Sequence, residues 1–211
     1  NIYNLLKTPR FLIHLLNVKD IVKEKNSINK YDLLEMILNK HFEVVNERAI
    51  IKIETNIHKK ILQSLALVMM MTGKSNLTME EFTIFLSNIN HLEIKSYILN
   101  KDIIESFLNN HVLLNYGDLI AFENKEIMEF LAAKEIFEND FSNKDLFDIV
   151  TIKDTNEINT LWFNTISYLV SKSKIYFNLI LNYIFNNLYI QDNLLDLLLS
   201  INYNFDDKNI I

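Results

Sequence analysis

The residues Thr72 to Ser75 contain the Gly-Lys-Ser triplet of a phosphate-binding P-loop. That loop cradles phosphates with backbone N–H groups, and it needs a further glycine five residues before the Gly-Lys pair and a strand leading into it. The earlier position is Val68, and Leu65 to Met71 follow a helical pattern. We therefore interpret Gly73 as the left-handed residue that ends a helix, not as part of a nucleotide site.

The remaining chemistry-bearing residues form no local catalytic or metal site. No two histidines share the i, i+4 spacing of a zinc helix; the five are His14, His41, His58, His91 and His111. The chain has no cysteine and only two glycines, which excludes thiolate chemistry and a Gly-x-Ser-x-Gly nucleophile elbow. We expect no catalytic residue, no metal ligand and no enzymatic activity in this chain by itself.

Charge argues against nucleic-acid binding. The net charge is −6, and the region 93–109 contains three carboxylates and only two bases, Lys95 and Lys101. The segment 112–122 adds Asp118 and no base. Such surfaces repel phosphate.

Composition predicts a mostly all-α fold. Apolar residues make up 49 % of the chain, with two glycines and one proline, so tight hairpins are few and a core can form. The residues Asn1 to Asn4 lack the basic start of a signal peptide, and no apolar run is long enough to span a bilayer. We expect a cytoplasmic protein without a membrane partner, and we expect a fragment of a longer chain because the sequence begins without Met.

Periodicity and capping signals predict the helices that precede the hairpin. Thr8 and Pro9 open the first, with an apolar face of Phe11, Leu12, Leu15 and Leu16. The second runs over 27–45 with Leu33, Leu34, Ile37, Leu38 and Phe42 inward, and 46–56 is a linker. The third covers 57–72, a Thr78/Glu81 capping box starts the next at Met79, and another covers 93–109.

One short β-hairpin interrupts the helices. The apolar runs 112–114 and 119–122 flank Asn115 to Asp118, with Gly117 at the turn. Asn124 then caps a helix that buries Ile127, Phe130, Leu131, Ala132 and Ile136. This order predicts a winged-helix-like unit over 54–139.

The chain on either side of that unit is predicted to be helical. Residues 1–53 form a small helical domain and a linker, and 140–211 form a bundle or an irregular repeat array. The four helices expected there cover 142–151, 156–171, 174–188 and 192–202, followed by a polar tail at 204–208.

The stretch Phe122 to Ala133, with Glu-Phe-Leu-Ala-Ala at 129–133, resembles the end of the winged-helix domain in NACHT-type STAND NTPases. Upstream, residues 62–71, the capped helix at Thr78, Thr8 to Leu12 and Tyr31 to Leu34 resemble further elements of that family in the same order. The resemblance spans about residues 5–137. It implies the C-terminal part of the small helical domain, the winged-helix domain and the helices that follow.

The resemblance also implies two nucleotide contacts. Pro9 takes the place of the proline that packs near adenine, and Asn124 takes the place of the histidine that reaches the phosphates. Asn can donate a hydrogen bond to phosphate but carries no titratable charge, so the contact is weaker and insensitive to pH. The plainer interpretations are a helix cap for Asn124 and a first-turn proline for Pro9.

Three functions remain open at this stage. The first is a regulatory, nucleotide-state-sensing segment of a STAND NTPase that serves antiviral defence and permits homo-oligomerisation, with ATP or ADP held by an upstream ATPase core and no cofactor in this piece. The second is a helical scaffold or adaptor that binds a protein through its C-terminal helices. The third is a winged-helix DNA-binding regulator.

Overall fold

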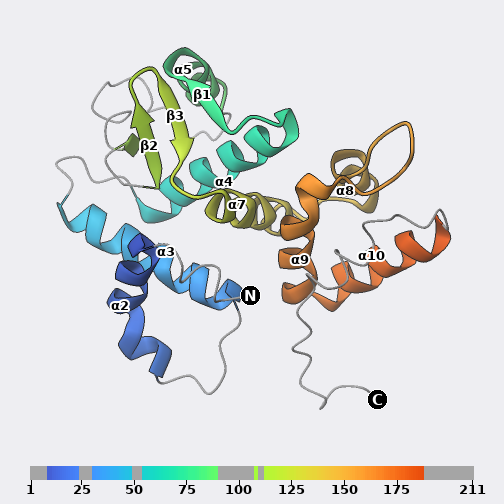
Figure 1. The fold of residues 1–211 in the computed structure, drawn as a ribbon, viewed down its shortest axis with the longest axis horizontal. Helices are drawn as coiled ribbons and strands as arrows, with labels where there is room; N and C mark the ends of the chain where they lie inside the picture. The colour runs from blue at the N-terminus through green and yellow to red at the C-terminus, as the bar shows by residue number, and fades with distance from the viewer. Residues whose placement is uncertain (1–8, 24–29, 49–53, 90–106, 109–111, 188–211) are drawn as a thin grey trace. The chain divides into compact units, whose positions relative to one another are not determined.

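The protein is mostly helical and carries one small antiparallel sheet (Figure 1), as composition predicted. The computed structural model describes residues 9–23, 30–48, 54–89, 107–108 and 112–187. In chain order the elements are α2 (Pro9–Lys23), α3 (Lys30–Arg48), α4 (Thr55–Thr72), β1 (Asn76–Thr78), α5 (Met79–Asn88), β2 (Leu113–Tyr116), β3 (Leu119–Phe122), α7 (Lys125–Glu138), α8 (Asn143–Val150), the 3₁₀ turn η1 (Thr160–Trp162), α9 (Phe163–Lys172) and α10 (Lys174–Asn186).

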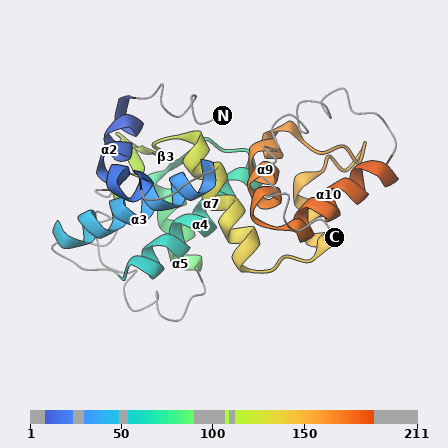
Figure 2. The same cartoon turned by 90° about the horizontal axis from the view of Figure 1, so that it is seen from below.

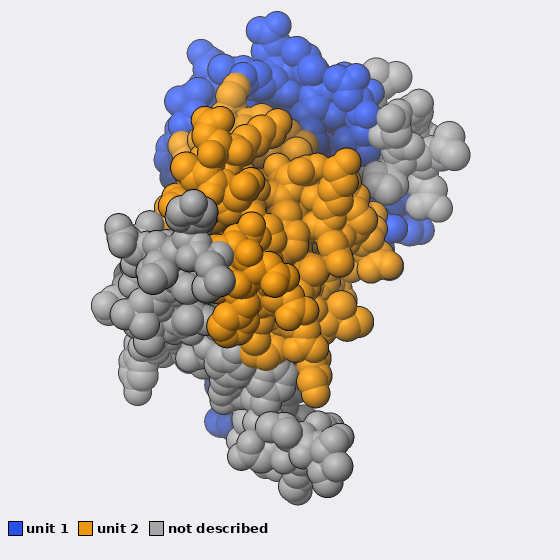
Figure 3. Space-filling model, turned by 90° about the vertical axis from the view of Figure 1, so that its right-hand side faces the viewer, with its two compact units in different colours: residues 1–62, 76–127 blue, residues 63–75, 128–211 orange. Residues whose placement is uncertain are grey.

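The chain divides into two compact units, coloured separately in Figure 3. Unit 1 comprises residues 1–62 and 76–127, and unit 2 comprises residues 63–75 and 128–211. Helices α4 and α7 each contribute residues to both units. The domain limits expected at 53 and 139 stay predictions.

The first part of unit 1 is the pair α2 and α3. The inward face predicted for α3 is confirmed, since Leu33, Leu34, Ile37, Leu38 and Phe42 are all buried. The face predicted for α2 is partly wrong: Val18 is buried, whereas Leu12 and Leu16 are 42 % and 63 % exposed. The linker is also shorter than 46–56, because α3 continues to Arg48 and α4 begins at Thr55.

The rest of unit 1 is winged-helix-like. Helix α4, strand β1, helix α5 and the hairpin β2–β3 follow in that order, and the sheet order is β1-β3-β2. Strand β1 was not predicted; it pairs antiparallel with β3 through Leu77 opposite Ile120. Of the helix expected over 93–109, only Phe107 and Leu108 lie within the described residues, and both are helical.

The hairpin is confirmed, with Leu113 opposite Phe122 and Tyr116 opposite Leu119. Gly117 has a φ of 71°, while Asp118 is not among the left-handed residues. Positive φ at the first turn residue alone is the arrangement of a type II′ hairpin, which favours glycine there.

Two predicted helix boundaries are confirmed by their hydrogen bonds. Gly73 has a φ of 66°. Its N–H donates to the carbonyl of Met70, and the N–H of Lys74 donates to the carbonyl of Met69, which together form a Schellman motif. At the start of α5, Thr78 and Glu81 complete the capping box, with bonds of 3.1 and 2.9 Å.

Unit 2 is a group of short helices. Helices α9 and α10 are separated by Ser173 alone and contact each other at an angle, as Figure 1 and Figure 2 show. The helix expected over 156–171 is shorter, because Asn156 is left-handed at φ 57° and Thr151 forms a β-bridge with Ile158 before Asn159 caps η1. The helix expected over 192–202 and the tail at 204–208 lie outside the described residues.

Candidate functional site

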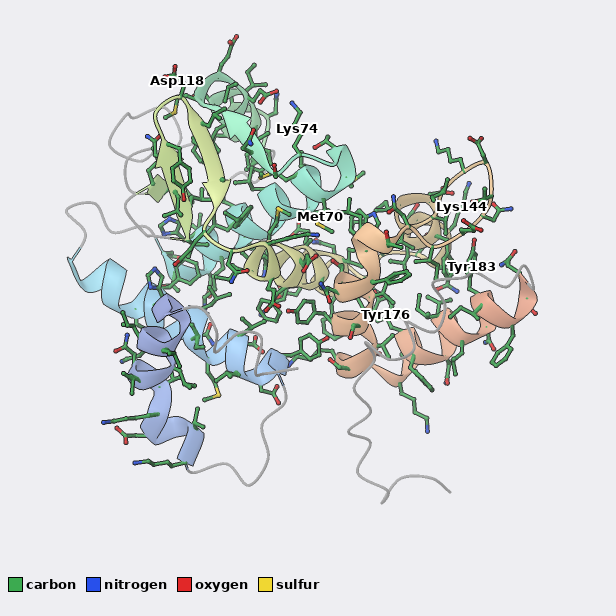
Figure 4. All side chains as sticks on the ribbon, in the orientation of Figure 1. Met70, Lys74, Asp118, Lys144, Tyr176 and Tyr183 are labelled. Atoms are coloured by element: carbon green, nitrogen blue, oxygen red, sulfur yellow. The ribbon has the colours of Figure 1, made fainter. Side chains whose placement is uncertain are left out.

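The Gly-Lys-Ser triplet has the geometry of a helix end. Helix α4 precedes it and strand β1 follows it, the reverse of the strand–loop–helix order of a P-loop. The N–H groups of Gly73 and Lys74 already donate to α4 carbonyls. Lys74 is exposed beyond the end of α4 (Figure 4). These amides are not available to cradle a phosphate, as the sequence predicted.

His58 is a core residue of unit 1. It is 2 % exposed, and its ring lies 4.2 Å from that of Phe107 and 5.7 Å from that of Phe42, measured between centroids. Burial, with a smaller contribution from the charge of His41, lowers the pKa of His58 from 6.5 to about 4. The imidazole is therefore neutral at physiological pH and packs as an aromatic side chain.

No metal site is found where the structure describes the chain: none of its His, Asp and Glu side chains there gather in groups of three. His91 and His111 lie outside the described residues. The expectation that no metal is bound stays a prediction.

Asn124 stands between the last strand of the sheet and α7. Its Oδ1 accepts a hydrogen bond of 2.7 Å from the N–H of Glu126, which makes it the N-cap of α7. The acceptor oxygen is thus engaged, and its Nδ2 has no hydrogen-bond partner among the described residues. The charged residues next to Asn124 in the sequence are two acids, Glu123 and Glu126, and one base, Lys125. The group that could reach a phosphate is this amide nitrogen, in surroundings that disfavour anions.

Pro9 is the first residue of α2, the position that suits a ring without an N–H. Its side chain lies outside the described residues. A site shared by Pro9 and Asn124 stays a prediction.

The buried carboxylate of Glu129 was not predicted. Glu129 lies on α7 and is 1 % exposed. Asn164 on α9 donates to its Oε2 at 2.9 Å, and the Thr165 hydroxyl donates to its backbone carbonyl at 3.4 Å. The sequence does contain a signal for this burial. Every residue of 127–133 other than Glu129 is apolar, and a helix that is apolar all round is buried.

Two tyrosines of α10, both labelled in Figure 4, have raised pKa values. Burial raises the pKa of Tyr176, and the charge of Asp140 adds to the effect. Burial also raises the pKa of Tyr183. A hydrogen bond with Thr151 lowers this pKa, but its effect is smaller than that of burial. Both phenols therefore stay protonated at neutral pH and are not poised as general bases.

Tyr183 has a structural role in unit 2. Its ring stacks on Phe147 at 3.9 Å between centroids, and its hydroxyl donates to the carbonyl of Asn156 at 2.8 Å. These contacts join α10 to α8 and to the loop that follows α8.

Comparison with models of known protein families gives no match for this chain, and comparison with curated proteins gives none either. None of the helices in the described part of the chain is both long enough and apolar enough to cross a membrane.

Proposed function

We propose that this chain is the regulatory segment of a NACHT-type STAND signalling NTPase, a cytoplasmic protein that serves in antiviral defence. Two features support the proposal. The chain has the winged-helix order of elements in unit 1, and the Glu-Phe-Leu-Ala-Ala stretch lies on α7, directly after the hairpin.

The observation that carries the proposal is the position of Asn124. It occupies the junction of β3 and α7, where the resembling family has its phosphate-contacting histidine, and its Oδ1 is used as a cap. The Nδ2 group would donate to a nucleotide phosphate held by an upstream ATPase core. Glu123 and Glu126 make this contact weak, and the amide makes it independent of pH.

In this account two parts of unit 1, the helical pair α2–α3 and the winged-helix-like part, act as a clamp. With ADP bound upstream, Asn124 and Pro9 help to hold the nucleotide and keep the full-length protein inactive. Exchange for ATP releases them, and rigid-body movement then permits homo-oligomerisation.

The first test uses the whole gene product. The coding sequence upstream of Asn1 should contain a P-loop about 200 residues earlier, the size of one ATPase core. Isothermal calorimetry should then show ADP binding to the full-length protein and no micromolar ATP binding to this chain alone. Tight ATP binding by this chain, or the absence of an upstream P-loop, would contradict the proposal.

A helical adaptor is the second candidate, because α10 exposes large apolar side chains. Ile175 and Phe185 are 78 % and 65 % exposed, and protein interfaces bury exposed aromatic and apolar side chains of this kind. The double variant Ile175→Ser/Phe185→Ser should abolish partner binding if this candidate is correct. A DNA-binding regulator is the least favoured, since Asp118 is the one charged residue of the hairpin 113–122.

A further inference from the structure

The outer face of the sheet in unit 1 is uncharged. Side chains of residues paired across antiparallel strands point to the same side. Tyr116 pairs with Leu119, and Leu119 pairs with Thr78. The next row pairs Leu114 with Ala121 and Ala121 with Asn76. We call these six residues the outer sheet face.

Part of the outer sheet face is both apolar and exposed. Tyr116 is 64 % exposed and Leu119 is 41 % exposed. On the opposite side of the same strands Leu77, Leu113, Ile120 and Phe122 are buried. The sheet thus buries one side in the core of unit 1 and presents an aromatic–aliphatic pair on the other. Tyrosine is enriched in the centres of protein interfaces.

The end of the outer sheet face next to the hairpin turn is acidic. The described residues at this end include Glu80, Glu81 and Asp118 and no Lys or Arg, whereas Lys74, Glu123 and Lys125 lie at the opposite end of the strands. The N–H of Met79 donates to the carbonyl of Asp118 at 3.0 Å, so the first turn of α5 adjoins the hairpin turn (Figure 4). Glu80 and Asp118 are therefore neighbours at the end of the sheet where Tyr116 and Leu119 lie.

We propose that the outer sheet face docks a basic segment of a partner protein, one that sets an apolar side chain beside Leu119 and a Lys or Arg near Asp118. A cation can also stack on the ring of Tyr116. Nucleic acid is repelled by the same carboxylates. A second copy of the chain would bring like charges together. The inference does not depend on nucleotide binding, and so it goes beyond the function proposed above.

The test measures peptide binding to the full chain by NMR titration and calorimetry. The probe is a short peptide of alternating lysine and leucine, and its counterpart alternates glutamate and leucine. We expect the lysine peptide alone to bind and to shift the amide signals of residues 113–122. Tyr116→Ser should weaken binding about tenfold, while Ile152→Ser, which removes an apolar side chain that is 40 % exposed in unit 2, should leave it unchanged.

A second pair of variants separates local charge from net charge. Asp118→Asn should weaken binding several-fold, and Asp154→Asn, which alters an exposed carboxylate in unit 2 and changes the net charge equally, should have no effect. All four variants should keep the melting temperature of the parent.

Several results would overturn the inference. The first is that the lysine peptide does not bind. The second is that a variant and its matched control lose the same amount of peptide affinity. The third is that the glutamate peptide binds as tightly as the lysine peptide. Duplex DNA binding or self-association that is lost in Tyr116→Ser would identify a different occupant and would overturn it as well.

Discussion

Asn164 Nδ2 donates a hydrogen bond of 2.9 Å to Oε2 of Glu129, joining α9 to α7 within unit 2. The carboxylate is 1 % exposed, so protein donors replace the water it has lost. The next residue of α9, Thr165, donates to the backbone carbonyl of the same Glu129. Together these contacts fix the register in which α9 packs on α7.

Removing the donor to Glu129 should destabilise the protein. Asn164→Ala leaves a buried carboxylate with one hydrogen bond fewer, and we expect the free energy of unfolding to fall by about 1–3 kcal/mol. Urea denaturation monitored by circular dichroism measures this. Asn178→Ala, the same exchange at an exposed position of α10, should change the free energy by about 0.5 kcal/mol or less. Equal effects would show that the bond to Glu129 contributes nothing.

The cap of α7 can be separated from the nucleotide contact proposed for the same residue. Asn124→Ala removes the acceptor for the Glu126 N–H and should lower the free energy of unfolding of this chain by about 1 kcal/mol. Asn124→Asp keeps an acceptor oxygen and caps equally well, so thermal unfolding should be close to that of the parent. If the alanine variant has the same free energy of unfolding as the parent, the side chain of Asn124 does not stabilise α7 as a cap.

Acidification should destabilise unit 1 through His58. Its pKa is about 4 in the fold and 6.5 in the unfolded chain, so the unfolded state binds a proton first as the pH falls. The contribution of neutral His58 to the free energy of unfolding is fully present above pH 6.5. It declines as the pH falls from 6.5 to about 4. The complete loss is about 3 kcal/mol, at 1.36 kcal/mol per pH unit.

A variant without the titrating group isolates this effect. His58→Met keeps a side chain that fits irregular cores, and its unfolding free energy should depend less on pH between 6.5 and 4 than that of the parent. Parallel pH profiles for the two proteins would mean that the pKa of His58 is the same in the fold as in the unfolded chain.

The hydroxyl of Tyr183 should contribute to the stability of unit 2. Tyr183→Phe keeps the stack on Phe147 and deletes the bond to Asn156, so we expect a loss of about 0.5–1.5 kcal/mol. Tyr116→Phe deletes an exposed hydroxyl and serves as the control, with a change of about 0.5 kcal/mol or less. Chemical denaturation distinguishes the two, and a Tyr183→Phe variant as stable as the control would count against the bond.

Local signals in the sequence predicted much of this fold. Gly73, Gly117 and the Thr78/Glu81 box each fix their own neighbourhood through φ or through capping, without help from distant residues. The inward face of α3 followed from helical spacing alone. Asn124 as a cap is of the same kind.

The features that were missed depend on distant partners. Strand β1 has three residues, too few for their alternation to identify a strand, and it exists because Leu77 pairs with Ile120 more than forty residues later. Glu129 is buried with Asn164 of α9 as a donor to its carboxylate, whereas a glutamate considered alone is expected at the surface. The expected apolar face of α2 failed because spacing shows which residues share a face but not whether another element covers it.

The most direct test of the central claim is the rate of ADP release from the full-length gene product, measured by stopped flow with a fluorescent ADP analogue. Asn124→Asp keeps the cap of α7 but replaces the Nδ2 donor with a carboxylate that repels phosphate. We expect release to be about tenfold faster or more in this variant, and unchanged in the Asn178→Ala control. Equal rates in Asn124→Asp and the parent, or no ADP binding by the full-length protein, would contradict the claim that this segment senses the nucleotide.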